Sequence, residues 1–264
     1  VTLQKLLIAI NVLCFHKVVF VDNGPPESLL SNHIALLVCD TSSSVSIVPY
    51  KTSRGFASGC NVGVGVSPVT PFILLVNPDA ELTATTVDAM LDAFAANPRL
   101  GVASPQLVTH AGALADTGDA FPSVVQLAWR KLRRPPDSRP STPSRENASS
   151  MHTVCPADWV SGAVMMIRRE VWDTVGGFDP AFFLYYEDID LCRRVRAAGW
   201  DVGVVTDAVA IHESGGSQWR PGTRTRVERI YFESQAYYFR KHHGRLMELV
   251  LRAVSYTHLT LPTI

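Results

Sequence analysis

The sequence predicts an α/β fold, as one domain or as one domain with an appendage, and three observations support this class. A length of 264 residues suits a domain of that type. Apolar residues make up 47% of the chain, which is ample for a buried core. Short apolar runs typical of strands alternate with segments that have helical spacing.

Charge and cysteine usage limit the partners and the compartment. Lys and Arg number 24, as do Asp and Glu, so the net charge is zero and no basic field favours nucleic acid. The scattered cysteines form no CxxC pair, which indicates reduced thiols in a cytoplasmic setting. The apolar run from Leu6 to Phe15 is too short to cross a bilayer and lacks a convincing cleavage site for a signal peptide.

The first quarter of the chain is predicted to hold a helix and two strands. Leu3–Leu13 has apolar residues at helical spacing, and Lys17–Val21 and Val45–Val48 are apolar runs typical of buried strands. Asp22-Asn23-Gly24 follows the first strand. This tripeptide is either a turn or, at the carboxyl end of a sheet strand, a place where an acidic group binds a ribose or base.

Two further segments suggest a ligand site, each with a plainer alternative. Residues 53–63 are rich in glycine, which favours either a ligand-contacting loop that enters a helix or a structural turn. The predicted strand Pro71–Val76 ends at Asn77-Pro78-Asp79. A carboxylate at a strand end can bind a hard divalent cation, although a proline turn is the commoner meaning of such a pattern.

The middle of the chain is predicted to be scaffold followed by a loop. Thr85–Ala96 reads as an amphipathic helix that ends at Asn97-Pro98, Gly101–Leu107 as a strand, and Gly112–Phe121 as a hairpin region. Residues 133–150 are rich in Pro, Ser and Arg, which is typical of a mobile loop. This loop is either a lid that gates an acceptor or a dispensable surface insertion.

The most informative stretch runs from Trp159 to Asp190. Ser161-Gly162 is predicted to be a turn before the strand Ala163–Ile167, and a short helix from Arg169 should end at Gly176-Gly177. An aromatic run then precedes three carboxylates at the start of another helix: Glu187, Asp188 and Asp190. These groups either cap the helix or, in a partly desolvated pocket, include a general base.

The last part of the chain offers three interpretations of its own. Val202–Val205 is a predicted strand, and His212 beyond it is either structural or a ligand. Arg224–Val254 is predicted to be a long helix interrupted at Gly244; its basic and aromatic residues suit either an anionic membrane surface or packing on the domain. Residues 255–264 look like a non-native tail, so we divide the chain into a domain at 1–222, a helical appendage at 223–254 and that tail.

Several of these motifs together resemble one family. SGAVMMIRREVWDTVGGFDPAFFLYYEDIDLCRRVRAAGW, at 161–200, resembles the second half of family-2 inverting glycosyltransferases of the GT-A fold, in the rhamnosyltransferase-like branch. VVFVDNG at 18–24 is similar to the family's nucleotide-binding strand, residues 54–63 to its GFAxGxNxG segment, and NPD at 77–79 to its Asp-x-Asp motif. The resemblance implies a mostly parallel central sheet flanked by helices, in which the family's opening strand has no counterpart here.

The resemblance also implies roles for particular residues. Asp188 would be the catalytic base, and Asp79 and His212 would bind a divalent cation, Mg²⁺ or Mn²⁺. The implied donor-binding residues are Asp22, Arg54, Gly55, Asn61 and Asp79. The implied acceptor-binding residues are Trp159, Gly162 and Glu187.

The implied activity is sugar transfer with inversion from a nucleotide-diphosphate donor to a saccharide or polyprenyl-linked acceptor in cell-envelope polysaccharide synthesis. The branch favours L-rhamnose from dTDP-rhamnose, and a cytoplasmic protein that contacts the inner face of the membrane peripherally. One alternative is a truncated, non-catalytic module that binds a nucleotide-sugar or glycan. Another is a nucleotidyltransferase, although the basic, glycine-rich phosphate loop expected of that class is not found near the N-terminus. The sequence gives no indication of the oligomeric state.

Overall fold

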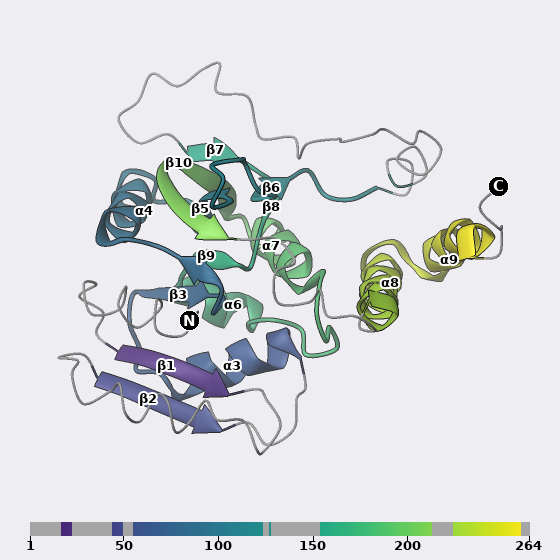
Figure 1. The fold of residues 1–264 in the computed structure, drawn as a ribbon, viewed down its shortest axis with the longest axis horizontal. Helices are drawn as coiled ribbons and strands as arrows, with labels where there is room; N and C mark the ends of the chain where they lie inside the picture. Colours follow the sequence, from purple (N-terminus) through teal and green to yellow (C-terminus); the bar gives the residue numbers. More distant parts are fainter. Residues whose placement is uncertain are drawn as a thin grey trace.

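A six-stranded mixed sheet forms the centre of the computed structural model, which describes residues 17–22, 44–49, 55–123, 127, 154–212 and 224–259 (Figure 1). Along the sheet the strands follow the order β3-β9-β5-β10-β4, with β7 paired to β10 beside this path. The strands are β3 (Phe72–Val76), β4 (Ala80–Glu81), β5 (Leu100–Val108), β7 (Val154–Pro156), β9 (Val164–Arg168) and β10 (Asp201–His212).

The expectation of a mostly parallel sheet is wrong for this central sheet. β5 and β10 pair in parallel, whereas β9 is antiparallel to both β3 and β5, and β10 is antiparallel to β4 and β7. The strand that separates β3 from β5 is β9, which enters the sheet late in the sequence. A continuous apolar run is compatible with parallel and with antiparallel pairing, so the sequence pattern alone does not reveal the orientation of β9.

A second, two-stranded sheet lies beside the first and carries the predicted strands at 17–21 and 45–48. It pairs β1 (Lys17–Asp22) with β2 (Ser44–Pro49) in parallel. Helix α3 (Phe56–Val66) packs on β1, where a Cβ added to Gly63 would lie 3.0 Å from the side chain of Val21. The glycine-rich segment is therefore mostly helical, rather than a loop that precedes a helix.

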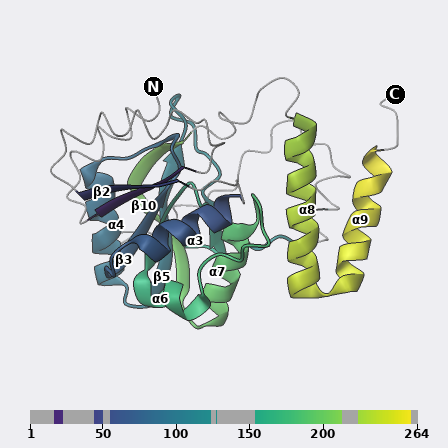
Figure 2. The same cartoon turned by 90° about the horizontal axis from the view of Figure 1, so that it is seen from below.

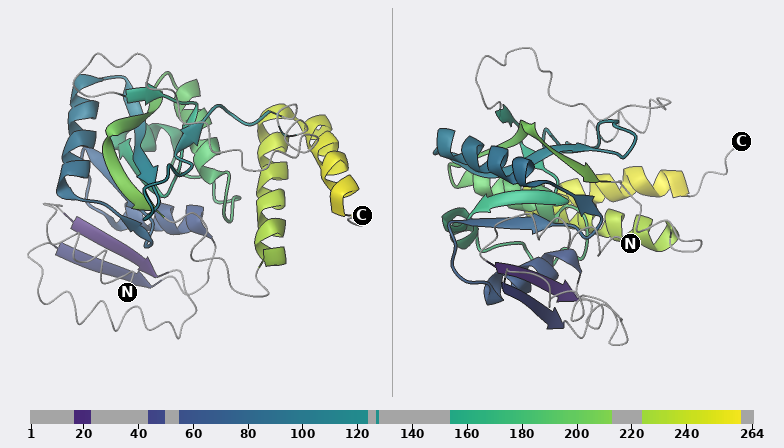
Figure 3. Two further views of the ribbon diagram at one scale, coloured as in Figure 1. Left: turned by 45° about the horizontal axis from the view of Figure 1, so that its top comes forward. Right: turned by 60° about the vertical axis from the view of Figure 1, so that its left-hand side comes forward.

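Helices cover both faces of the central sheet (Figures 1 and 3). On one face, α4 (Ala84–Ala96) packs Met90 and Phe94 against strand residues such as Met166. On the other face, α6 (Arg169–Val175) and α7 (Glu187–Ala197) pack against neighbouring strand residues such as Met165 and Ile167. Because alternate residues of β9 enter different clusters, both of its faces are buried, which explains its continuous apolar run.

The ends of two helices follow the sequence closely. The hydroxyl and backbone of Thr83 exchange hydrogen bonds with Thr86, and this capping box starts α4. Helix α6 ends at Gly176, whose φ of 77° lies in the left-handed region that glycine adopts without strain. The predicted helix that starts near Arg169 and stops at Gly176-Gly177 is confirmed.

A helical hairpin completes the described chain (Figure 2). It consists of α8 (Arg224–His243) and α9 (Arg245–Leu259), which meet at Gly244 with a φ of 84°, as the interruption in the sequence predicts. Tyr238 and Phe239 are buried, so for these aromatic residues the packed interpretation holds. Helix α9 ends at Leu259 rather than near residue 254, and so extends into the segment interpreted as a tail.

The predicted hairpin region contains one short strand. The short pair β6 (Gly118–Asp119) and β8 (Trp159–Val160) connects the predicted hairpin region with the start of the 159–190 stretch. The predicted helix Leu3–Leu13 and the loop 133–150 lie outside the described residues. In the part of the chain that the structure describes, no helix has both the length and the apolar character needed to cross a membrane.

Candidate active site

Asp188 lies at the start of α7 and is held in place by backbone N–H groups. Gly162 N donates to Oδ2 at 3.1 Å, and Ile189 N donates to Oδ1 at 2.9 Å. Burial, opposed by backbone N–H groups that include those of Gly162 and Ile189 and assisted by the nearby charge of Asp116, leaves the pKa of Asp188 raised to about 6. At neutral pH this carboxylate is therefore ionised yet close to its pKa, which suits a general base.

The backbone that delivers Asp188 is unusual. Tyr185 and Tyr186 have φ of 69° and 66°, so two successive aromatic residues lie in the left-handed region. The Tyr186 side chain is buried, and its hydroxyl accepts a hydrogen bond from Gln235 of α8. Because α8 packs on Tyr186, the surrounding structure compensates for the unfavourable backbone and fixes the direction in which α7 begins.

Glu187 is enclosed in the interior of the protein. It is only 5% exposed, and its Oε2 has no hydrogen-bond partner among the described residues. Burial, with the charge of Asp188 added, raises the pKa of Glu187 well above its usual value. An enclosed Glu187 leaves little surface with which to contact a bound acceptor, the role that the resemblance implies for it.

Asp79 and His212 meet at the end of the central sheet. Asp79 follows β3, and the antiparallel pairing of β4 with β10 places Ala80 opposite His212. As a result, Asp79 Oδ1 and His212 Nε2 lie 3.5 Å apart. The hydrogen bond with His212 lowers the pKa of Asp79, against the opposing effect of burial.

This pair fits part of a divalent-cation site. A carboxylate and an imidazole are suitable ligands for Mn²⁺, and a two-ligand site leaves positions open for substrate phosphates. Within the described ranges, no third His, Cys, Asp or Glu joins them.

The Asp79–His212 pair and Asp188 are connected through the turn that precedes β9. Asn77 N donates to Ala163 O at 2.8 Å, so the turn that carries Asp79 is tied to the start of β9. The preceding residue, Gly162, donates to Asp188. A ligand that reaches from the Asp79–His212 pair to Asp188 would therefore contact the candidate cation site at one end and the candidate base at the other.

Of the remaining predicted donor-binding residues, the structure describes the contacts of Asn61 and Gly55. The Asn61 amide donates to Phe178 O at 2.8 Å and accepts from Phe178 N at 2.9 Å, so it fastens the turn after α6 to α3. Gly55 has a φ of 88° and lies against the loop at Phe183, whose carbonyl oxygen would be 1.9 Å from an added Cβ. Arg54 and the side chain of Asp22 lie outside the described residues.

On the predicted acceptor side, Gly162 lies directly beside the base. A Cβ at Gly162 would be 3.3 Å from the Phe56 ring and 3.6 Å from Asp188 Cβ. Trp159 is partly buried, and its indole N–H donates to Ala120 O at 3.1 Å. Gly162 and the Phe56 ring therefore adjoin Asp188, while Trp159 is fastened to the backbone at Ala120.

Sequence reasoning missed the function of Asp190, which it treated as supporting or capping. Its side chain is fully buried and binds Arg194 Nε at 2.8 Å, His242 Nε2 at 2.7 Å and Lys241 Nζ at 2.7 Å. Asp190 therefore joins helix α7 to α8. The spacing to Arg194 was visible as an i, i+4 pair, whereas nothing local reveals partners about 50 residues away.

Comparisons with known proteins agree with this geometry. The family model "Glycosyl transferase family group 2" matches residues 141–262. N-acetylglucosaminyl-diphospho-decaprenol L-rhamnosyltransferase of Mycobacterium tuberculosis is 26% identical over 211 residues, covering 71% of this chain and 69% of the relative.

Solved structures share the fold. The mannosyltransferase PcManGT of Pyrobaculum calidifontis, in complex with GDP-Man and Mn²⁺, aligns with a TM-score of 0.60 at 15% identity over 98% of this chain and 66% of its own. GalNAc-T7 with UDP, GalNAc and Mn²⁺ aligns with a TM-score of 0.56 at 11% identity over 86% of this chain. The match spans 45% of the GalNAc-T7 chain.

Proposed function

We propose that this family-2 glycosyltransferase, which is rhamnosyltransferase-like, moves L-rhamnose from dTDP-rhamnose to a lipid-linked saccharide with inversion. The observation that carries the proposal is Asp188, a carboxylate whose pKa is raised to about 6 chiefly by burial and which backbone N–H groups hold in place. The donor and acceptor classes follow the rhamnosyltransferase relative, whose name includes a diphospho-decaprenol acceptor.

In the proposed reaction, Asp188 takes the proton of an acceptor hydroxyl as the hydroxyl oxygen attacks the anomeric carbon. A new C–O bond forms on one face of the sugar while the bond to the diphosphate breaks on the opposite face, which inverts the anomeric centre. The nucleoside diphosphate leaves with the bonding electrons, and the proton later passes from Asp188 to solvent. Glu187 is buried, so Asp188 is the carboxylate assigned to this proton transfer.

Asp79 and His212 are the residues that would hold Mg²⁺ or Mn²⁺, and two structural neighbours contain Mn²⁺. When bound, such an ion neutralises negative charge on a leaving diphosphate. We further propose that Asp22, Arg54 and Gly55 contact the donor nucleotide, with Asn61 positioning the loop at Phe178. Trp159 and Gly162 would shape the acceptor side.

The acceptor class also suggests where the protein works. A polyprenyl-linked saccharide lies at a membrane, so we propose a cytoplasmic protein in peripheral contact with the inner face, acting in cell-envelope polysaccharide synthesis. Leu246, Leu249 and Val250 of α9 support this location, because they are 74%, 62% and 40% exposed and recur at helical spacing. On α8, by contrast, the aromatic residues Tyr238 and Phe239 are buried and Tyr231 is 39% exposed.

The experiment that tests the proposed function is a calorimetric titration with dTDP, UDP and GDP, each with and without Mn²⁺, followed by transfer assays with the matching sugars. The acceptor would be a short-chain prenyl-diphosphate N-acetylglucosamine, and NMR would give the anomeric configuration of the product. We expect Mn²⁺-dependent binding of dTDP and an inverted rhamnoside. A retained configuration would contradict the mechanism, and nucleotide binding without transfer would favour a non-catalytic binding module.

A further inference from the structure

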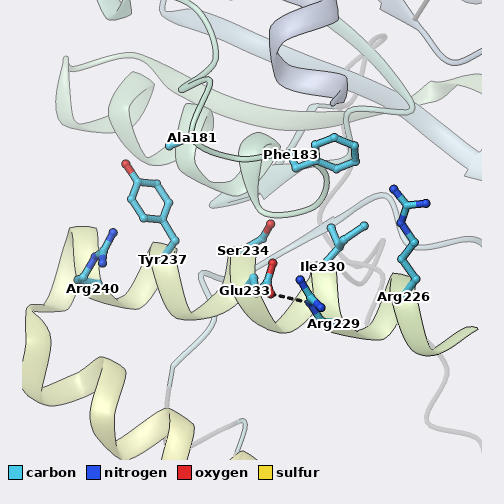
Figure 4. Close-up of a pocket in the computed structure, with 9 residues that line it drawn as sticks. All are labelled: Ala181, Phe183, Arg226, Arg229, Ile230, Glu233, Ser234, Tyr237 and Arg240. Carbon is cyan, nitrogen blue, oxygen red and sulfur yellow. Dashed lines mark hydrogen bonds and ion pairs between the residues drawn. The ribbon is translucent and has the colours of Figure 1, made fainter. Parts of the chain in front are cut away.

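A groove with a cavity volume of about 850 Å³ separates α8 from the loop that leads into α7 (Figure 4). In Figure 4, Arg226 and Phe183 lie toward one end, and Arg240 and Tyr237 toward the other. The lining residues are Ala181, Phe183, Arg226, Arg229, Ile230, Glu233, Ser234, Tyr237 and Arg240. None of them belongs to the donor, metal or base positions described above.

The groove carries an excess of positive charge. Its lining includes three arginines and one carboxylate, Glu233, which pairs with Arg229 at 2.8 Å. Arg240 stacks 5.2 Å from the centre of the Tyr237 ring, and neither it nor Arg226 forms an ion pair within the described part of the chain. Two guanidinium groups thus remain available for an anion, and their planar donors suit phosphate oxygens.

The same groove has apolar surface. The Phe183 ring is 38% exposed, and Ile230 and Tyr237 lie along the α8 side. Cations beside exposed aromatic and aliphatic groups are suited to a ligand that joins a phosphate group to a sugar ring or hydrocarbon chain. A purely polar anion would leave this apolar surface unused.

The groove also lies next to the base. Phe183 O accepts a hydrogen bond from Phe56 N at 2.8 Å, and the Phe56 ring in turn faces Gly162, whose N–H holds Asp188. The loop that carries Ala181 and Phe183 continues through Tyr186 directly into α7. A ligand anchored in the groove could therefore extend past Phe183 toward Asp188.

We infer that this groove binds a lipid-linked acceptor, with Arg226 as the residue that holds its diphosphate, Arg240 as a second cation that attracts the anion to the groove and Phe183 as the apolar contact. The inference rests on the proposed function for the identity of the acceptor, and it adds the site that captures it. The diphosphate would be held on α8 while the sugar hydroxyl reaches the base at the start of α7. Donor and acceptor diphosphates would then occupy separate cationic sites.

The test is the double variant Arg226→Gln/Arg240→Gln, with Arg252→Gln on α9 as the matched control. Arg252 is an exposed arginine of the same hairpin and pairs with Glu248 outside the groove. We expect the double variant to raise the acceptor KM at least about tenfold, the size of losing a charged hydrogen bond. Its kcat and its calorimetric affinity for dTDP should match those of the control.

A binding measurement separates this inference from the proposed function. Farnesyl diphosphate without donor or metal should bind the wild type and the control, and bind the double variant at least about tenfold more weakly. This binding measurement does not depend on sugar transfer, so it tests the groove even if the proposed activity is absent. Unchanged farnesyl diphosphate affinity would overturn the inference. So would a loss confined to dTDP, which would assign the groove to the donor, or a loss confined to phosphatidylglycerol vesicles, which would make it a membrane contact.

Discussion

At Asp188, burial and hydrogen bonding act in opposite directions on the same carboxylate. Burial destabilises the ionised form, and the N–H groups of Gly162 and Ile189 stabilise it. The balance leaves a base that is ionised at neutral pH yet not far from its pKa. An exposed carboxylate would be a weaker base, and one buried without donors would stay protonated.

This balance predicts how activity depends on pH. The proposed base must be ionised, so kcat should fall as the pH drops through about 6, approaching a tenfold loss per pH unit below it. Initial rates at saturating substrate between pH 5 and 8 would measure this, with a dTDP titration at each pH as the control for donor binding. A rate that stays level down to pH 5 would contradict the assignment.

The stability of the fold should depend on Asp188 in the opposite sense. Because its pKa is raised in the folded state, protonation favours folding, and this contribution is lost as the pH rises from about 4 through about 6. The variant Asp188→Asn removes the charge and keeps an acceptor oxygen, so it should not lower the melting temperature at pH 7.

Asp79 is expected to control the response to metal. Asp79→Ala removes the carboxylate of the two-residue pair with His212, so the Mn²⁺ concentration for half-maximal transfer should rise at least about tenfold. Asp88→Ala, on the exposed surface of α4, is the control for loss of one negative charge. A metal titration that is the same for wild type and Asp79→Ala would remove this residue from the cation site.

Among the elements, α3 depends on one glycine for its approach to the loop at Phe183. Gly55→Ala adds a Cβ that would overlap Phe183 O at a φ of 88°, so we expect a loss of roughly 2 kcal/mol in the free energy of unfolding. Gly65→Ala in the same helix meets nothing within 4 Å and should be neutral or stabilising. Urea unfolding of both variants compares them directly, and equal stabilities would show that the close approach is not required.

Helix α8 is attached to α7 through Asp190. Burial opposes its ionisation, but hydrogen bonds from His242 and Lys241, with the charge of Arg194, hold the pKa of Asp190 below its usual value. The lowered pKa means that this stabilisation is present above about pH 4 and is lost as the pH falls further. The helical appendage is thus part of the folded unit through a buried ionic contact.

Asp190→Asn should therefore destabilise the protein by about 2 kcal/mol at pH 7, because it removes the buried charge to which the partly exposed Arg194 and Lys241 donate. Asp173→Asn is the matched control: it breaks an i, i+4 pair with Arg169 in which the aspartate is 55% exposed, and should cost less than about 0.5 kcal/mol. Thermal unfolding reports both changes. Equal melting temperatures for the two variants would show that the α7–α8 contact is dispensable.

Local signals predicted the elements well, and their partners poorly. Glycine at 176 and the apolar run at 163–167 marked the end of α6 and the strand β9 at 164–168, because both depend on neighbouring residues. The antiparallel insertion of β9 and the packing of α8 on Tyr186 depend on contacts distant in sequence. The contact of Asn61 is also distant in sequence: the family resemblance assigned this residue to the donor, whereas its amide hydrogen-bonds the backbone of Phe178.

Across the whole molecule, the fold brings the candidate site together from segments far apart in the chain. The turn after β3, the end of β10, the turn before β9 and the start of α7 supply Asp79, His212, Gly162 and Asp188. Through the family resemblance, the sequence motifs predicted that these residues belong to one site. Their distances required the sheet order, in which β9 lies beside β3 and β4 lies beside β10.

The measurement that tests the central claim most directly is the transfer rate of Asp188→Asn beside its affinity for dTDP. The variant keeps an oxygen that can accept from Gly162 N, but it cannot take a proton from an acceptor hydroxyl. We predict a loss of at least about 100-fold in kcat, with dTDP affinity within about twofold of wild type. Turnover at the wild-type rate would contradict the account, because the reaction would then have another base.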